Sequence, residues 1–237
     1  MKTVGTIAWK EIKTYFASPI AYVIATFYVG LTGYFFGTGI SKPFAEASCA
    51  DYLIPSTLVL TLWAPLITMR LLSEEQKLGT LEVLLTSPIR DWEIVIGKFL
   101  ASLAILAASV AITLYYVLLL FLLGDPDPGP ILAGYCGLLL YGAATLSVGI
   151  FASSLTSNQV VAGTMAMSVL LLLNFIQGAS AVLSGWPAAV LNYLSLSMRF
   201  TDFTRGILDG SSIVFYLSFT GFFLFLTVKS LESHRWR

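Results

Sequence analysis

The chain has 237 residues, of which 57% are hydrophobic and 11% are charged, and its formal net charge is zero. Soluble domains are about 25% charged, so this chain cannot build a water-soluble surface and much of it should lie in lipid. The zero net charge gives no indication of a nucleic-acid partner. The two cysteines, Cys49 and Cys136, exclude a disulfide framework and leave room for one bridge at most, and no metal site is expected.

Residues 1–18 come before the first apolar block and are predicted to form a helix. Its apolar side chains recur at helical spacing: Val4, Ile7, Ala8, Ile12, Tyr15 and Phe16. Trp9 suits the headgroup region, and Lys10 and Lys13 lie off the apolar face. We therefore expect an interfacial helix along the membrane surface, which serves either as an anchor alone or also as a partner contact.

Six apolar blocks are long enough to cross a bilayer, which requires about 20 residues per helix. They are Ile20–Gly39, Leu53–Met69, Phe99–Leu123, Ile131–Ala152, Val160–Leu183 and Ser212–Val228. A lipid-exposed strand would leave backbone groups unpaired, so each block is predicted to be a helix. The first block is long and lacks a cleavage signal, so it is interpreted as a retained anchor.

Lysine and arginine gather in three segments: the N-terminal segment, the connection between blocks two and three, and the tail. This bias places all three on the cytoplasmic side. The whole chain is expected to be one all-α transmembrane domain. Its predicted parts are 1–18, the interfacial helix; 20–72, spans one and two; 73–90, a connecting helix; 94–183, spans three to five; 184–210, an outer segment; 211–229, span six; and 230–237, a cytoplasmic tail.

Residues 73–88 are the most informative stretch of the connection between blocks two and three. Ser73 and Gln76 fit a capping box, in which each side chain satisfies a backbone N–H at the helix start. Three leucines then fall on one helical face, and Pro88 should end the element: Leu78, Leu81 and Leu85. A short amphipathic helix is expected. It either packs on the membrane surface or inserts into a groove of a soluble partner.

Proline and glycine punctuate the spans. Pro55 and Pro65 are expected to bend or break the second span. The fourth span has a side of small residues where another helix can approach closely: Gly134, Gly137, Gly142 and Gly149. Both packing within the chain and contact with another subunit fit this glycine side.

The outer segment, residues 184–210, is too long for a simple turn. It mixes apolar and aromatic residues with both signs of charge, so we expect short re-entrant helices that dip back toward the membrane. Asp202 lies one helical turn from both Arg199 and Arg205, which predicts two ion pairs. These pairs are expected to hold an outer lid together, with direct substrate contact as the alternative.

The six blocks lack the groups that drive transport or catalysis. None contains Asp, Glu, Lys, Arg or His, whereas ion-coupled carriers use such residues. The phosphate-binding pattern G-x-x-x-x-G-K-[ST] finds only Gly97-Lys98, with Phe99 where Ser or Thr is required and Trp92 in place of the first Gly. The chain is therefore not expected to be an enzyme or to bind a cofactor itself, and its energy should come from a partner.

Several short sequences resemble ABC-2 type exporter permeases, the membrane subunits of type V ABC exporters. The stretch most similar to their cytoplasmic loop is Glu74-Glu75, Gly79-Thr80-Leu81-Glu82, Leu84-Leu85-Thr86 and Pro88. Ala8-Trp9-Lys10-Glu11 is similar to the family's N-terminal interface helix, and Gly97-Lys98 to its entry into the third span. Phe203-Thr204-Arg205-Gly206 and the chain's last residues look most like the gliding-motility-type branch.

The resemblance implies that residues 73–90 hold a coupling helix that docks on a cytosolic ABC ATPase. The residues it implies for this contact are Glu74, Glu75, Lys77, Leu78, Gly79, Thr80, Leu81, Glu82 and Leu85, with Trp9 and Lys10. It also implies two ATPase subunits that carry ATP and Mg²⁺, and a second permease, identical or related. The location it implies is a bacterial or archaeal cytoplasmic membrane, with both termini cytoplasmic.

The expected mechanism is alternating access, in which two permease subunits shift against each other along their small-residue faces. Two other functions stay open. The chain is either an ion-coupled secondary carrier, against which the uncharged spans argue, or a membrane scaffold that recruits a cytosolic complex and moves nothing.

Overall fold

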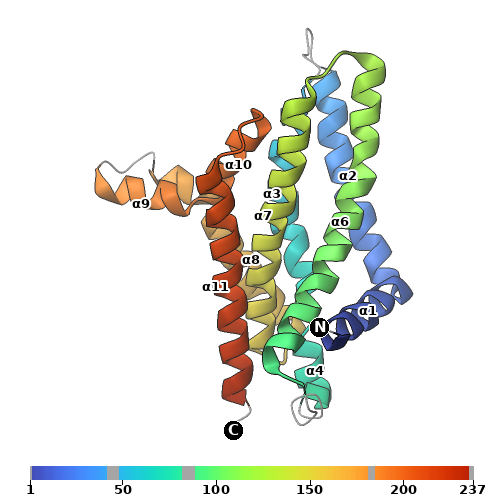
Figure 1. Cartoon of the computed structure of the whole chain (residues 1–237), viewed down its shortest axis with the longest axis vertical. Coiled ribbons are helices and arrows are strands. Elements are labelled where there is room, and N and C mark those ends of the chain that lie inside the picture. Colours follow the sequence, from blue (N-terminus) through green and yellow to red (C-terminus); the bar gives the residue numbers. More distant parts are fainter. Residues whose placement is uncertain (1, 42–47, 82–88, 181–184, 235–237) are drawn as a thin grey trace.

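The computed structural model describes residues 2–41, 48–81, 89–180 and 185–234 and arranges them as a bundle of helices (Figure 1). Six helices are long and apolar enough to cross a membrane, which confirms the six predicted spans. They are α2 (Pro19–Ile40), α3 (Ala50–Thr68), α6 (Asp91–Leu123), α7 (Pro128–Ser154), α8 (Gln159–Ser180) and α11 (Gly210–His234). The shorter helices are α1 (Lys2–Ala17), α4 (Ser73–Leu78), α9 (Trp186–Leu194) and α10 (Leu196–Thr204).

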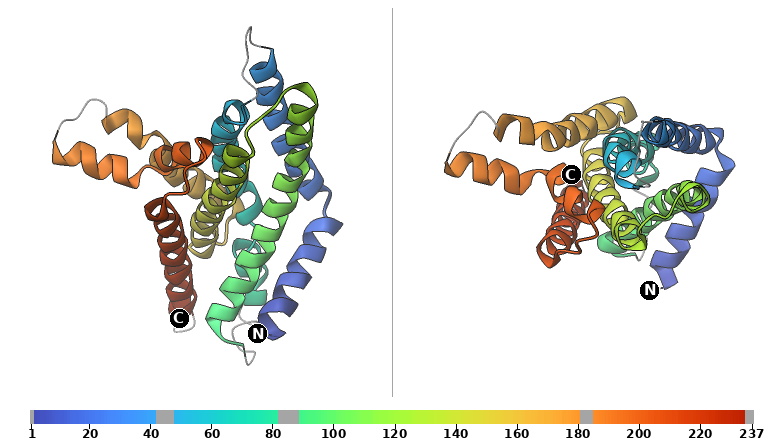
Figure 2. Two further views of the ribbon diagram at one scale, coloured as in Figure 1. Left: turned by 45° about the horizontal axis from the view of Figure 1, so that its top comes forward. Right: turned by 90° about the horizontal axis from the view of Figure 1, so that it is seen from above.

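The two ends of the bundle are formed by different segments (Figure 1). α1, α4 and the C-terminal end of α11 lie at one end, which we call the α4 end, and the C-terminal ends of α2 and α6 lie at the other. The three segments rich in lysine and arginine thus share one end, as predicted, over the residues described. α9 projects sideways from the bundle (Figures 1 and 2). The return of α9 and α10 toward a membrane stays a prediction.

Helix α7 is the central helix of the bundle (Figure 2). It contacts α3, α6, α8, α10 and α11. In its most apolar window 72% of the residues are buried, against 22% for both α8 and α11. α7 is therefore packed mainly by its own chain, whereas α8 and α11 leave most of their apolar surface for lipid or another protein.

Two glycines near the start of α7 admit side chains from neighbouring helices. A Cβ at Gly134 would stand 2.5 Å from Leu53 Cδ1 of α3. A Cβ at Gly137 would stand 2.6 Å from Phe203 Cγ of α10. Real Cβ atoms do not come this close to another carbon, so only glycine lets α3 and α10 pack here.

Two further glycines repeat this arrangement along α7. A Cβ at Gly142 would collide with the Leu106 side chain of α6, and one at Gly149 would collide with Thr68 of α3. All four glycines therefore serve packing within the chain, which was one of the two interpretations the sequence allowed. The expectation that two subunits slide along this face is wrong, because the chain's own helices already occupy it.

The second span does not break at its prolines. α3 continues as one helix through Pro55 and Pro65. Each proline removes only one backbone N–H, and α2, α7 and α8 pack around α3. Of the predicted bend or break, the break is therefore wrong, because tertiary packing holds the helix where its local sequence disfavours it, and the bend stays a prediction.

Gly149→Ala tests the close approach of α3 and α7. The Thr68 hydroxyl that the new methyl group would meet is buried and donates to the Ala64 carbonyl at 2.8 Å, so it has little freedom to move. We expect a loss of about 1–3 kcal/mol in the free energy of unfolding, measured by thermal unfolding in detergent. In the control Gly221→Ala on α11, the methyl group meets nothing within 4 Å, and no loss is expected. Equal melting temperatures for the two variants would contradict this account of α7.

Candidate functional site

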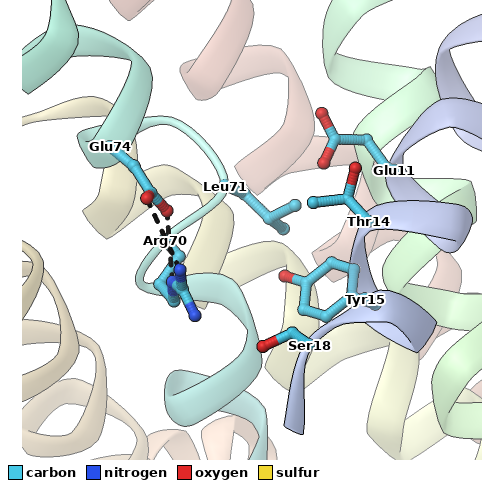
Figure 3. A pocket seen from close by; sticks show the side chains of 7 residues that line it. All are labelled: Glu11, Thr14, Tyr15, Ser18, Arg70, Leu71 and Glu74. Atoms are coloured by element: carbon cyan, nitrogen blue, oxygen red, sulfur yellow. Dashed lines mark hydrogen bonds and ion pairs between the residues drawn. The ribbon is translucent and has the colours of Figure 1, made fainter. Parts of the chain in front are cut away.

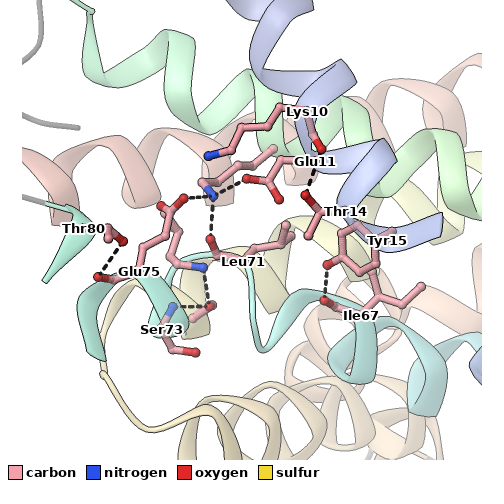
Figure 4. A network of polar contacts seen from close by, with 12 residues as sticks. Lys10, Glu11, Thr14, Tyr15, Ile67, Leu71, Ser73, Glu75 and Thr80 are labelled. Atoms are coloured by element: carbon pink, nitrogen blue, oxygen red, sulfur yellow. Dashed lines mark hydrogen bonds and ion pairs between the residues drawn. The ribbon is translucent and has the colours of Figure 1, made fainter. Parts of the chain in front are cut away.

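A buried lysine joins three segments at the α4 end, and its partners Glu11, Leu71 and Glu75 are labelled in Figure 4. Lys98 lies about two turns into α6, and only 1% of its side chain is exposed. Its Nζ donates to Glu11 Oε1 of α1 at 2.9 Å and to Glu75 Oε1 of α4 at 2.8 Å. A third hydrogen bond runs from Nζ to the carbonyl oxygen of Leu71 at 2.7 Å. All three N–H donors of the ammonium group are therefore satisfied.

We call Lys98, Glu11 and Glu75 the ion cluster. The two carboxylates are mostly buried, with side chains 14% and 19% exposed. Removing one partner from a buried ion pair costs about 3–5 kcal/mol, because the remaining charge is left uncompensated. α1 and α4 are thus both fixed to the first turns of α6. If either helix moved away, buried charges of the ion cluster would lose their partner.

Close packing beside the ion cluster brings α1 onto α6. A Cβ at Gly97 would stand 2.8 Å from Ile7 Cγ2 of α1. Ala8 is buried on the same side of α1, whereas Trp9 and Lys10 are exposed. Gly97 therefore lets α1 approach α6 closely enough for Glu11 to pair with Lys98, the residue that follows Gly97.

The turn between α3 and α4 is held by the end of α7. Ser153 Oγ accepts hydrogen bonds from the backbone N–H groups of Leu72 at 3.1 Å and Ser73 at 3.0 Å. The same hydroxyl donates to the carbonyl oxygen of Met69 at 3.1 Å. One buried serine thereby satisfies the backbone N–H groups of Leu72 and Ser73 at the start of α4 and adds a second hydrogen bond to the Met69 carbonyl.

The next residue of α7 extends this attachment to two further helices. The carbonyl oxygen of Ser154 accepts hydrogen bonds from Gln76 Nε2 of α4 at 2.8 Å and from Ser230 Oγ of α11 at 3.3 Å.

The predicted capping box is therefore wrong. Ser73 is the first residue of α4 rather than its cap and donates to Met69, and Gln76 reaches outside its own helix.

A pocket of about 70 Å³ lies between α1 and the start of α4 (Figure 3). It is lined by Glu11, Thr14, Tyr15, Ser18, Arg70, Leu71 and Glu74. Arg70 pairs with Glu74 at 3.1 Å, and the Tyr15 hydroxyl donates to the carbonyl oxygen of Ile67 at 2.6 Å. Burial raises the pKa of Tyr15, so its hydroxyl stays protonated and remains a donor. The Tyr15 hydrogen bond adds to the ion cluster by holding α1 against α3, and the Arg70–Glu74 pair fixes the turn that leads into α4.

Helix α4 is shorter than predicted. It ends at Leu78, because Gly79 adopts a left-handed conformation with φ of 69° and reverses the chain. The prediction of one uninterrupted helix over this connection is therefore wrong. Leu78 is left at the end of the helix with 67% of its surface exposed.

The residues expected to contact an ATPase divide by the direction they face. Glu75 faces inward and pairs with buried Lys98, whereas Glu74 pairs with Arg70 in a contact that is partly exposed. The exposed members are Lys77, Leu78, Gly79 and Thr80, which we call the α4 tip, and Trp9 and Lys10 of α1. Leu81 is buried, and Glu82 and Leu85 lie outside the described residues.

The ion pairs predicted for the outer segment do not form within the described residues. The Arg199 guanidinium lies 4.2 Å from the centre of the Tyr193 ring and 4.3 Å from that of Phe215, and its Nε donates to the Tyr193 carbonyl at 3.2 Å. No described ion pair joins Asp202 to Arg199 or to Arg205. The two aromatic rings give the cation a partner that helical spacing alone does not reveal.

The two cysteines do not pair. Cys49 is buried at the start of α3, and Cys136 is exposed on α7. The single bridge that the sequence allowed is therefore absent. Over the described part of the chain, no group of His, Cys, Asp and Glu side chains is placed to hold a metal ion.

The chain belongs to the ABC-2 family of transporters. The family described as "ABC-2 family transporter protein" matches residues 5–229, a range that contains the ion cluster and reaches into all six long helices. This confirms the family to which the sequence was likened. The gliding-motility-type branch stays a prediction.

Two curated relatives are permeases. The chain is 26% identical over 160 residues to the probable multidrug ABC transporter permease YbhR of Escherichia coli K12. The aligned region covers 66% of this chain and 43% of YbhR. It is 30% identical over 144 residues to the inner membrane transport permease YhhJ of the same strain. This aligned region covers 61% of this chain and 38% of YhhJ. The match thus spans less than half the length of either relative.

Lys98→Met tests the ion cluster. The variant leaves Glu11 and Glu75 buried together without a cation, so we expect a loss of about 3–5 kcal/mol in stability. Faster proteolysis of α1 should accompany a lower melting temperature. Lys77→Met is the matched control, because Lys77 is exposed at the end of α4 and should be nearly neutral. The cluster would be of no structural importance if the two variants melted and were cleaved alike.

Proposed function

We propose that this chain is the permease subunit of an ATP-binding cassette exporter, driven by a separate cytosolic ATPase that docks on the α4 tip. The position of Leu78 carries the proposal. It is an exposed apolar side chain at the end of a short helix whose acidic residues, Glu74 and Glu75, are already paired with Arg70 and Lys98. Such a helix end fits a groove on a soluble partner. ATP and Mg²⁺ would bind to that partner.

The contacts behind the tip support force transmission. α4 is attached through the ion cluster to α1 and α6, and through Ser153 and Ser154 to α7 and α11. A partner that pushes or pulls the tip therefore acts on several spans at once. A helix held only by its two connections would move alone.

The α4 end is proposed to face the cytoplasm of a bacterial or archaeal cell. The excess of lysine and arginine in its three segments supports this orientation, and the name of YhhJ, an inner membrane transport permease, agrees with it. A second permease, identical or related, would complete the transporter. Because α7 is covered by its own chain, that subunit must contact exposed faces of other spans, of which α8 and α11 offer the largest.

Export by alternating access is the mechanism we favour. The name of YbhR, a probable multidrug permease, supports drugs as a class of cargo. The two other functions make different demands. A secondary carrier would concentrate a solute without ATP, and a scaffold would bind an ATPase whose activity no transported compound stimulates.

Leu78→Asp tests docking on the α4 tip. A charge at the centre of an apolar contact should weaken binding of the ATPase by about tenfold or more. The measurement is the amount of ATPase that co-purifies in mild detergent, together with ATP hydrolysis by the complex. Ser233→Asp, at the same end of the bundle on α11, places an equal charge away from the tip and should retain the ATPase. Full co-purification with Leu78→Asp would show that the partner docks elsewhere.

Gly79 offers a second test, because its backbone conformation sets the direction of the tip. Valine strongly disfavours the left-handed region, whereas asparagine tolerates it. We expect Gly79→Val to lose ATP-driven transport in reconstituted vesicles and Gly79→Asn to keep most of it. A Cβ at this position meets nothing within 4 Å, so crowding cannot explain a difference. If the two variants transported equally well, the shape of the tip would not matter.

A further inference from the structure

A second polar junction lies among the spans, far along the chain from the ion cluster. Asn174 of α8 donates from Nδ2 to Thr61 Oγ1 of α3 at 2.8 Å and to the Tyr141 hydroxyl of α7 at 2.7 Å. Its Oδ1 accepts a hydrogen bond from Ser197 Oγ of α10 at 2.5 Å. One amide thus joins α8 to three other helices, α3, α7 and α10. Tyr141 and Thr61 fall near the middle of their helices, so the junction lies deep in the bundle.

The junction is fully built. Thr61 and Tyr141 are completely buried, and their hydroxyls lie 2.6 Å apart. Both N–H donors of the Asn174 amide are used, and its oxygen has a partner. In lipid an unpaired amide is costly, so these partners hold one another in place.

Asn174 also differs from the other polar residues of α8. The hydroxyls of Thr164 and Ser168 donate to carbonyl oxygens of their own helix. Among the described side chains of α8, Asn174 alone makes hydrogen bonds to other helices. Ala162, Ala166 and Leu170 bury one side of α8, and the amide adds hydrogen bonds that join α8 to α3, α7 and α10.

The helices α3 and α7, which accept hydrogen bonds from Asn174 near their middles, also hold α4 at the α4 end of the bundle. α3 leads into α4 through Leu71, whose carbonyl accepts from Lys98, and α7 holds the same turn through Ser153. A movement of α4 therefore reaches Thr61 and Tyr141 along two helices. Ser197 stands on the far side of the amide, on the outer helix α10.

We propose that Asn174 is a positioning residue that makes α10 follow movements of α3 and α7. The inference rests on the proposed function, because it requires an ATPase that moves α4. Removal of the amide would leave α4 and the ATPase contact intact and would remove the hydrogen bonds that join α10 to Thr61 of α3 through Asn174. α10 would then be held by the Tyr216 hydroxyl, which donates to the Leu196 carbonyl at 2.7 Å, and by the packing of buried Phe200 and Phe203 against α7.

The test follows the accessibility of α10 through the ATP cycle. Met198 is 43% exposed on α10, so Met198→Cys is made in a Cys49→Ala, Cys136→Ser background. The complex with its ATPase is placed in lipid vesicles, and the rate of maleimide labelling is measured without nucleotide and with ATP and vanadate. Loss of an interhelical hydrogen bond of this kind shifts an equilibrium by about threefold to tenfold. We expect a nucleotide-dependent change in rate for the parent and a reduction of that change by about this factor in Asn174→Leu.

Two further variants separate positioning from general damage. Ser197→Ala cuts only the contact to α10 and should reproduce the Asn174→Leu result, with ATP hydrolysis retained in both. Ser168→Ala removes a hydroxyl that bonds only to its own helix and should behave like the parent.

The outcomes distinguish this inference from the proposed function. A parent complex that hydrolyses ATP but shows no nucleotide-dependent labelling overturns the role of Asn174 alone. The same holds if Asn174→Leu and Ser197→Ala retain the full change. A parent that assembles with no ATPase overturns the proposed function, and this inference with it.

Discussion

One buried ammonium group determines how the α4 end of this protein is assembled. Lys98 donates all of its hydrogen bonds to α1, to α4 and to the turn before α4. A charge this deeply buried is tolerated only when its partners stay in place. The positions of α1 and α4, which are far apart in sequence, therefore both depend on the Lys98 side chain of α6. The short helix α4 owes its position to this constraint, since six residues cannot form a stable helix in isolation.

Helix α7 extends this constraint into the rest of the bundle. Its last residues hold the start of α4, its middle carries Tyr141, and its glycines admit α3, α6 and α10. Hydrogen bonds and close backbone approach are the main sources of helix association in lipid, where the hydrophobic effect contributes little between spans. α7 combines both along its length. Movement at one end of this helix is therefore expected to be felt at the other, whereas α8 and α11 remain free to face lipid or a partner.

Hydropathy predicted the six spans well because a bilayer leaves few alternatives to a long apolar helix. The local features were harder. Lys98 counted only as one more charge beside the third span, since nothing in the sequence shows that Glu11 and Glu75 meet at it. Gly79 was included in a helix because leucine spacing continues past it, and a single left-handed residue does not disturb that spacing. Arg199 was paired with an acid by spacing, and its aromatic partners come from two other helices. The errors at Lys98 and Arg199 concern tertiary contacts, whereas the error at Gly79 concerns a local backbone conformation.

The central claim is that α1, α4 and the start of α6 move as one unit. Spin labels at Lys13→Cys and Trp92→Cys, both on exposed positions outside the α4 tip, are placed in a Cys49→Ala, Cys136→Ser background. They allow the distance between α1 and the start of α6 to be measured by pulsed electron paramagnetic resonance. The measurement is made on the ATPase-bound protein in lipid, without nucleotide and with ATP trapped. The account predicts the same narrow distance distribution in both states. A distribution that shifts or broadens when ATP is trapped would contradict it, because the ion cluster would then have opened.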